Sequence, residues 1–170
     1  MDVTMRIGAA CVMTAAGAWI GRMLAGAQMR RTQTLEALGS GVRRLEVEML
    51  ERRMPLSEAL GACENGLFCA AAGEMRKGRA PFEAYRRAAE RLRKRGGMLD
   101  SLEEGDMAAL GRLFAHLGMD GMQSQRLLLR DAQEELARLT AQARSKHQEY
   151  GKLYTSLGAL SGGALALLMM

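Results

Sequence analysis

The sequence contains few of the residues on which several protein classes depend. Its 170 residues include 2 Pro and 3 Cys, and only 4% are aromatic. Two prolines argue against a β-sandwich or barrel with many turns, and against a proline-rich linker. Three cysteines without Cys-x-x-Cys spacing are too few for a disulfide framework and do not match a structural zinc site. At this length the chain has room for one domain.

Residues for catalysis are scarce as well. His116 and His147 are 31 residues apart, which excludes a site built from several imidazoles, and we interpret both as packing or interface residues. Glu103, Glu104 and Asp106 stand at the start of a predicted helix, where their negative charges interact favourably with the helix dipole. The sequence therefore predicts no catalytic residue, no metal site and no cofactor, and the protein is not expected to be an enzyme.

Two long segments, one near each end of the chain, carry no charge. Residues 7–21 and 153–170 carry none, whereas all but two of the 24 basic and 19 acidic residues lie within 22–152. This layout is typical of a soluble region between two membrane segments. We interpret residues 3–25 and 153–170 as transmembrane helices that flank a cytoplasmic helical domain at 26–152.

The C-terminal segment gives the stronger membrane signal. As a helix its 18 residues would extend about 27 Å, close to the roughly 30 Å of a hydrocarbon core. Tyr150 and Tyr154 stand at its start, where an aromatic belt is expected, and Lys152 can reach the interface. A buried C-terminal core helix is the alternative, although uncharged runs of this length are uncommon in soluble domains.

The N-terminal segment is shorter and rich in Ala and Gly. As a helix of about 22 Å, it spans a bilayer only if Arg6 and Arg22 reach opposite interfaces. The alternative is a cleaved secretory signal with the cleavage site Ala25-Gly26-Ala27, which would leave a C-terminally anchored helical binding domain outside the cytoplasm. Arg22, between the apolar run and that site, argues against cleavage.

Both segments contain glycines four residues apart, a spacing that lets membrane helices approach closely. The pairs predict packing between the two spans or against another subunit, and they leave oligomerisation open. These glycines are Gly17, Gly21, Gly158 and Gly162.

Basic residues near the two segments predict the orientation. By the positive-inside rule, the middle of the chain faces the cytoplasm and both termini point out, as in a multi-pass protein of the cell membrane. The basic residues concerned are Arg22, Arg30 and Arg31 after the first segment, and Arg144, Lys146 and Lys152 before the second.

The middle of the chain is predicted to be all-α, because apolar residues recur there at steps of three and four. The first and last helices each have such a seam and are predicted to pack antiparallel as a stalk that continues into the membrane. Shorter helices would cap this stalk. The predicted helices begin near Leu35, Pro55, Leu67, Pro81, Ser101 (as a capping box with Glu104) and Asp120.

The same spacing assigns residues to the core. Gly39 and Gly41 are expected to weaken the first helix by about 1 kcal/mol each relative to Ala. Cys63 and Cys69 are interpreted as small buried residues. The predicted buried stripes are Leu35, Leu38, Val42, Leu45 and Met49 in the first helix, and Phe82, Tyr85, Ala89 and Leu92 in the fourth.

A basic stretch stands out in the middle. Residues 76–95 contain nine basic and two acidic side chains, a local net charge of +7. It is either a solvated helix face, a docking surface for an acidic protein, or a contact for anionic lipid headgroups. A membrane-tethered nucleic-acid binder is less favoured, because no aromatic stacking platform is evident. The residues assigned to partner binding are Arg79, Arg86, Arg87, Arg91 and Lys94.

Several local strings stand in order along the chain: Leu45-Glu46-Val47-Glu48-Met49, Pro55-Leu56-Ser57-Glu58-Ala59-Leu60, Leu110-Gly111, Leu117-Gly118, Gln125, and Lys152-Leu153-Tyr154-Thr155-Ser156-Leu157-Gly158. In this order they resemble the stage III sporulation protein AB family of endospore-forming bacteria. The resemblance covers essentially the whole chain. One departure is Gly121, where family members tend to carry Asp before the long helix, and Asp120 is the expected cap instead.

The resemblance implies a function that composition does not show. The soluble part would resemble a type II secretion F domain, the class of membrane platform component that couples a cytoplasmic ATPase to an envelope-spanning machine. The equivalent sporulation complex joins mother cell and forespore. The implied partners are the ATPase of that complex, stage III sporulation protein AA, and its other membrane proteins, with no nucleic acid and no cofactor.

Overall fold

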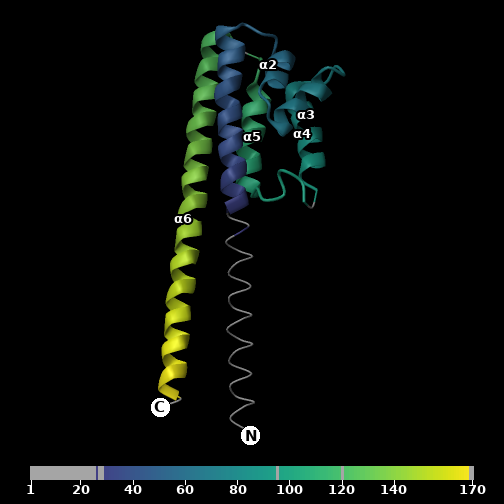
Figure 1. Ribbon diagram of the computed structural model, residues 1–170. Helices are drawn as coiled ribbons and strands as arrows, with labels where there is room; N and C mark the ends of the chain where they lie inside the picture. Colours follow the sequence, from purple (N-terminus) through teal and green to yellow (C-terminus); the bar gives the residue numbers. More distant parts are fainter. Residues whose placement is uncertain (1–25, 27–28, 95, 120, 169–170) are drawn as a thin grey trace. The chain divides into compact units, whose positions relative to one another are not determined.

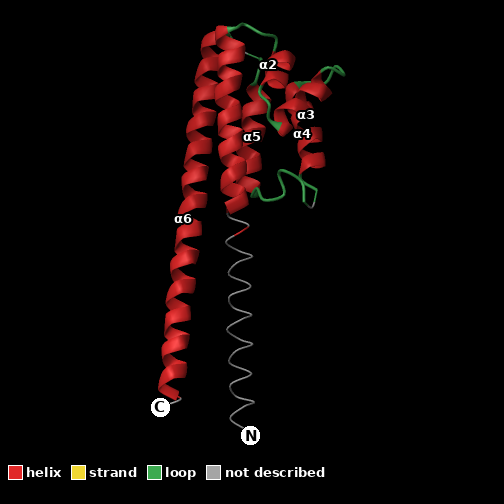
Figure 2. Cartoon of the chain, in the orientation of Figure 1, coloured by secondary structure: helices red, strands yellow, loops and turns green. Residues whose placement is uncertain are grey.

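The computed structural model describes the chain except residues 1–25, 27–28, 95, 120 and 169–170, and it describes side chains only as far as residue 146. Within these limits the fold is an all-α bundle of six helices (Figures 1 and 2). The prediction of an all-α fold is confirmed. The first helix, residues 29–46, runs into η1 (Val47–Glu51), which is followed by α2 (Leu56–Ala62), α3 (Gly66–Met75), α4 (Pro81–Leu92), α5 (Glu104–His116) and α6 (Met122–Leu168).

The chain divides into two compact units. Residues Arg31–Ala141 form one of them, here called the helical domain, and residues Met1–Arg30 with Gln142–Met170 form the other. Consecutive helices pack on one another in the helical domain, α2 on α3, α3 on α4 and α4 on α5. The contacts described below lie within this domain.

The buried stripe of the first helix is confirmed over its α-helical part. Leu35, Leu38, Val42 and Leu45 are all fully buried. In η1 the chain forms a wider π turn, closed by the Arg52 N–H donating to the Val47 carbonyl at 3.1 Å. The wider turn takes in an extra residue and so rotates the register. Glu48 and Leu50 are therefore buried there, whereas Met49 of the predicted stripe is only half-buried.

An aromatic cluster forms the centre of the helical domain. The ring of Phe68 lies 5.9 Å from that of Phe114, which stacks on Tyr85 at 4.9 Å, centroid to centroid. Phe68 also faces Gly41 on the first helix, where an added Cβ would stand 2.5 Å from the Phe68 Cε2 atom. Gly41 thus lets the first helix approach the cluster closely, whereas a Cβ at Gly39 would meet nothing nearer than 3.8 Å.

Local signals in the sequence account for the helix ends around this cluster. The Asn65 side chain accepts from the Leu67 N–H at 3.1 Å and caps α3. Gly78, with φ +86°, follows the end of α3. Pro81 opens α4, where its missing N–H costs nothing. The start of α4 is as predicted, and α3 begins one residue before its predicted start at Leu67.

The predicted buried face of α4 is partly wrong. Tyr85 and Ala89 are buried, but Phe82 is 49% exposed and Leu92 is only partly covered. Small residues of α4 form most of its contact with α3 and α5, and Phe82 lies at the edge of that contact. The buried side chains of α4 are Ala84, Tyr85, Ala88 and Ala89.

The start of α5 differs from the prediction by two residues. The capping box consists of Glu103 and Asp106, in place of Ser101 and Glu104: the Glu103 side chain accepts from the N3 N–H, and Asp106 accepts from the Glu103 N–H at 2.9 Å. The shift follows from a second role of Asp106, which is described below.

The turn between α5 and α6 is held by a buried glutamine. The Gln125 side chain accepts from the Gly118 N–H and donates to the His116 carbonyl, both at 3.0 Å. Gly118 has φ +79°, a conformation that suits glycine. Asp120, the predicted cap of the last helix, lies outside the described residues.

The last helix begins near the predicted position and extends to Leu168. In the apolar seam of this helix, Leu129, Leu136 and Leu139 are buried and Ala132 is half-buried. Among the described residues, no helix has the length and apolar character that a membrane crossing requires. The predicted span at 3–25 lies outside the described residues, as do the side chains of the span at 153–170.

Candidate functional site

The described part of the basic stretch comprises the turn after α3, α4 and the two residues that follow α4. At its centre is Glu74, a carboxylate on α3 that is almost fully buried. Lys77 donates to it at 2.9 Å and Arg91 at 2.8 Å, and Arg79 donates to its other oxygen. Two cations of the turn after α3 and one of α4 thus converge on one anion of α3.

This arrangement keeps Glu74 ionised. The hydrogen bond from Lys77 lowers the pKa of the carboxyl group most, and the charges of Arg79 and Arg91 act in the same direction, while desolvation opposes them. A buried carboxylate with several charge-assisted hydrogen bonds also restrains its donors. Arg79 and Arg91, two of the five predicted binding residues, therefore link α3 to α4 as part of the fold.

The other three predicted residues lie on α4 or just after it, and all three are exposed. Arg87 lies 3.5 Å from Glu83, one turn earlier on α4, in an exposed ion pair that contributes little to stability. Arg86 and Lys94 are exposed, and neither has an ion pair with another described residue. Arg95 is not described.

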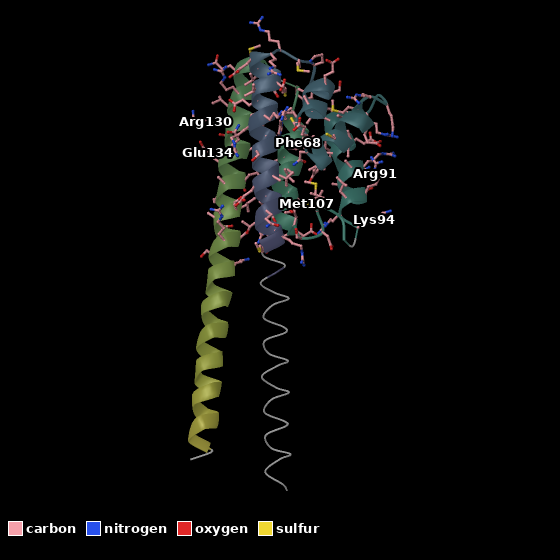
Figure 3. The ribbon with its side chains drawn as sticks, viewed as in Figure 1. Phe68, Arg91, Lys94, Met107, Arg130 and Glu134 are labelled. Atoms are coloured by element: carbon pink, nitrogen blue, oxygen red, sulfur yellow. The ribbon has the colours of Figure 1, made fainter. Side chains whose placement is uncertain are left out.

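Figure 3 places this surface within the helical domain. Arg91 and Lys94 lie on the side formed by α4, and Arg130 and Glu134 of α6 lie on the opposite side. The latter two form an i,i+4 ion pair at 3.5 Å. We call Arg79, Arg86, Arg87, Arg91 and Lys94 the basic face.

A second charged cluster was not predicted. Arg31 is 4% exposed and Asp106 fully buried, and the two form a bidentate pair, with Nε to Oδ2 at 2.7 Å and Nη2 to Oδ1 at 2.8 Å. Glu103 accepts a further bond from Arg31 at 2.5 Å. The hydrogen bond with Asp106 raises the pKa of Arg31 further, so the guanidinium stays charged.

This cluster changes the interpretation of Arg31 as a topogenic charge beside the membrane. The side chain points into the helical domain and joins the first helix to the start of α5. The acidic group Glu103, Glu104 and Asp106 indicated that a charged cluster could form at the start of this helix. The sequence offered no way to choose its partner among 24 basic residues.

The remaining candidate residues form no catalytic arrangement among the described residues. His116 is exposed, and His147 lies outside the described side chains. Cys63 is buried, and burial raises the pKa of its thiol to about 11. Cys69 is exposed, so the prediction that it is buried is wrong. Among described residues, no group of His, Cys, Asp and Glu could hold a metal ion.

The predicted membrane-packing glycines are not placed against a neighbour. Gly17 and Gly21 lie outside the described residues. Gly158 and Gly162 lie in the helical backbone of α6, beyond the residues whose surroundings are described. Their role stays a prediction.

Comparison with known proteins identifies the family. The family model for stage III sporulation protein AB matches residues 6–170. A solved structure named stage III sporulation protein AB (SpoIIIAB) has a TM-score of 0.60 with 20% sequence identity, and the match covers 70% of this chain and 97% of that one. At this identity the structural match supports the fold alone. No curated protein matches the chain.

The family match extends over nearly the whole chain, and the fold of a family member agrees with it. This protein therefore belongs to the stage III sporulation protein AB family, a component of the sporulation channel complex.

Proposed function

We propose that this protein is a membrane platform component of the channel complex between mother cell and forespore, and that it couples a cytoplasmic ATPase to the membrane components. Its family membership supports a place in the complex. The uncharged segments at 7–21 and 153–170 support two spans. The proposed transmission is mechanical, through the helices that lead towards these segments.

The observation that carries the partner assignment is the basic face. Glu74 binds Arg79 and Arg91 and thereby joins α3 to the turn and to α4. The neighbouring basic side chains therefore project from a rigid part of the fold. A preorganised charged surface loses little side-chain freedom on binding and steers partners of opposite charge. We assign an acidic surface of stage III sporulation protein AA to it.

Charge reversal tests this assignment. The triple variant Arg86→Glu, Arg87→Glu and Lys94→Glu is expected to bind the ATPase at least tenfold more weakly, a loss of about 1.4 kcal/mol in binding free energy. The reason is that three attractive contacts become repulsive. Arg79 and Arg91 are left unchanged, since replacing them would leave Glu74 short of partners. Affinity is measured by titrating the ATPase onto the immobilised full chain in detergent.

A matched variant separates the basic face from net charge. Arg126→Glu, Arg130→Glu and Arg138→Glu reverses three exposed charges on α6 and changes the total charge equally. It should bind the ATPase like the unchanged chain. Equal affinity for both triple variants would remove the basic face from the proposal.

Thiol labelling tests the proposed orientation, and the native cysteines suit it. With Cys11 replaced by Ser, the exposed Cys69 reports on the helical domain, whereas the buried Cys63, with its high pKa, should stay unmodified. A membrane-impermeant maleimide should label Cys69 only after cells are permeabilised. Cysteines added at residue 2 and after Met170 should react in intact cells. Labelling of Cys69 in intact cells would instead support the anchored domain outside the cytoplasm.

A further inference from the structure

Phe82 is the exception among the described aromatic residues. Phe68, Tyr85 and Phe114 are buried in the central cluster, whereas Phe82 is 49% exposed near the start of α4. Its ring lies 6.4 Å from that of Tyr85, centroid to centroid, so the exposed ring extends the buried cluster to the surface. Isolated exposed apolar residues are common, so the argument depends on the neighbours of Phe82.

Phe82 lies against α5 at a glycine. A Cβ added at Gly111 would stand 3.8 Å from Phe82 Cε2 and 3.7 Å from Tyr85 Cε1, so both rings face this point of α5. Beneath them the Tyr85 hydroxyl donates to the Met107 carbonyl at 2.8 Å and fixes α4 on α5 (Figure 3 labels Met107). The position of the ring is thus set by a rigid base.

Arg86 supplies a cation on the same helix as Phe82. Arg86 follows Phe82 by one helical turn and so lies on the same side of α4. It is exposed and has no ion pair with another described residue. With Glu74 and Glu104, which pair with Arg91 and Arg93, the five basic side chains of residues 81–94 stand against four acidic ones, so the surroundings keep a positive charge and favour a negatively charged partner. We call Phe82, Arg86 and Gly111 the Phe82 seam.

We propose that the Phe82 seam binds an acidic, partly apolar segment of the partner protein. An apolar side chain of that segment packs on the ring of Phe82 over Gly111, and a neighbouring carboxylate pairs with Arg86. Aromatic and arginine side chains on a rigid base are the residue types that carry most of the energy at interfaces. The inference rests on the proposed function, which supplies the partner, and adds an apolar anchor to the basic face.

Single substitutions in the full chain test the seam, with the ATPase as the probe. Phe82→Ala is expected to weaken binding about 30-fold, the effect of a typical aromatic hot spot. Phe82→Leu should retain most of the affinity because it keeps an apolar side chain there. Arg86→Glu should weaken binding about tenfold, and high salt should reduce that difference.

Leu127→Ala is the matched control, because Leu127 is an apolar side chain on α6 that is 59% exposed. It should bind the ATPase like the unchanged chain. The thermal midpoints of all variants should agree closely, which shows that the fold is intact. If Phe82→Ala proved unstable, Arg86→Glu and Phe82→Leu would still decide the outcome.

Two results would overturn the seam. One is binding by Phe82→Ala as tight as that of Leu127→Ala while the triple charge reversal still weakens it, which would leave the proposed function standing. The other is a dimer in sedimentation that Phe82→Ala converts to a monomer, since a second copy of the chain would then occupy the seam. No binding by the unchanged chain would instead refute the proposed function itself.

Discussion

Arg31→Met is expected to lower the free energy of unfolding of the helical domain by about 3–5 kcal/mol, the usual effect of removing one partner of a buried ion pair. Asp106 is fully buried and accepts two hydrogen bonds from Arg31. Without the guanidinium, this carboxylate keeps its charge or takes up a proton, and either outcome costs stability. Urea unfolding of the full chain, followed by circular dichroism, measures the change.

Two further variants identify the cause. Arg30→Met removes an adjacent, exposed charge and should change stability by less than about 0.5 kcal/mol. The double variant Arg31→Met and Asp106→Leu should lose less than the two single losses combined, because no isolated charge remains buried. Additive losses would show that Arg31 contributes through packing of its aliphatic part and not through Asp106.

Gly41→Ala and Gly39→Ala are expected to have opposite signs, although both exchange glycine for the better helix former. At Gly39 the new methyl group meets nothing nearer than 3.8 Å, so the helix should gain about 0.5–1 kcal/mol. At Gly41 it would stand 2.5 Å from Phe68 Cε2 and 2.9 Å from Cδ2. Because Phe68 is fully buried, the core must shift to remove this clash, and the shift is expected to cost about 1–3 kcal/mol of stability.

The two unfolding free energies should therefore differ by about 1.5–4 kcal/mol. Combining Gly41→Ala with Phe68→Leu tests the contact, since the smaller side chain frees space for the methyl group. The combined loss should be smaller than the two separate losses together. A stabilising Gly41→Ala would contradict the close approach of the first helix to Phe68.

Much of the fold follows from the sequence because helix periodicity is a local signal. The stripe from Leu35 to Leu45 and the start of α4 at Pro81 are as predicted. The errors arise in two situations. In one, a single turn changes the register of a helix; in the other, the sequence allows more than one face of a helix to be the buried face. The π turn at Val47–Glu51 moves burial from Met49 to its neighbours, and the small residues of α4 leave Phe82 at the surface.

The candidate site was predicted less completely, because pairing across the fold is not a local property. The number of positive charges between residues 76 and 95 located the basic face, but it could not show that Glu74 binds three of them. Nor could it show that Arg93 pairs with Glu104 of α5. The effective charge of this surface is therefore smaller than composition suggests.

The bond between Arg31 and Asp106 also determines how the helical domain responds to tension. Arg31 is the residue at which the chain enters this domain, and its partner lies 75 positions further along the sequence. A pull on the preceding segment is thus shared at once between the first helix and α5, instead of fraying the first helix turn by turn. In the mechanical role proposed above, such an attachment carries force to the core before any helix has to unwind.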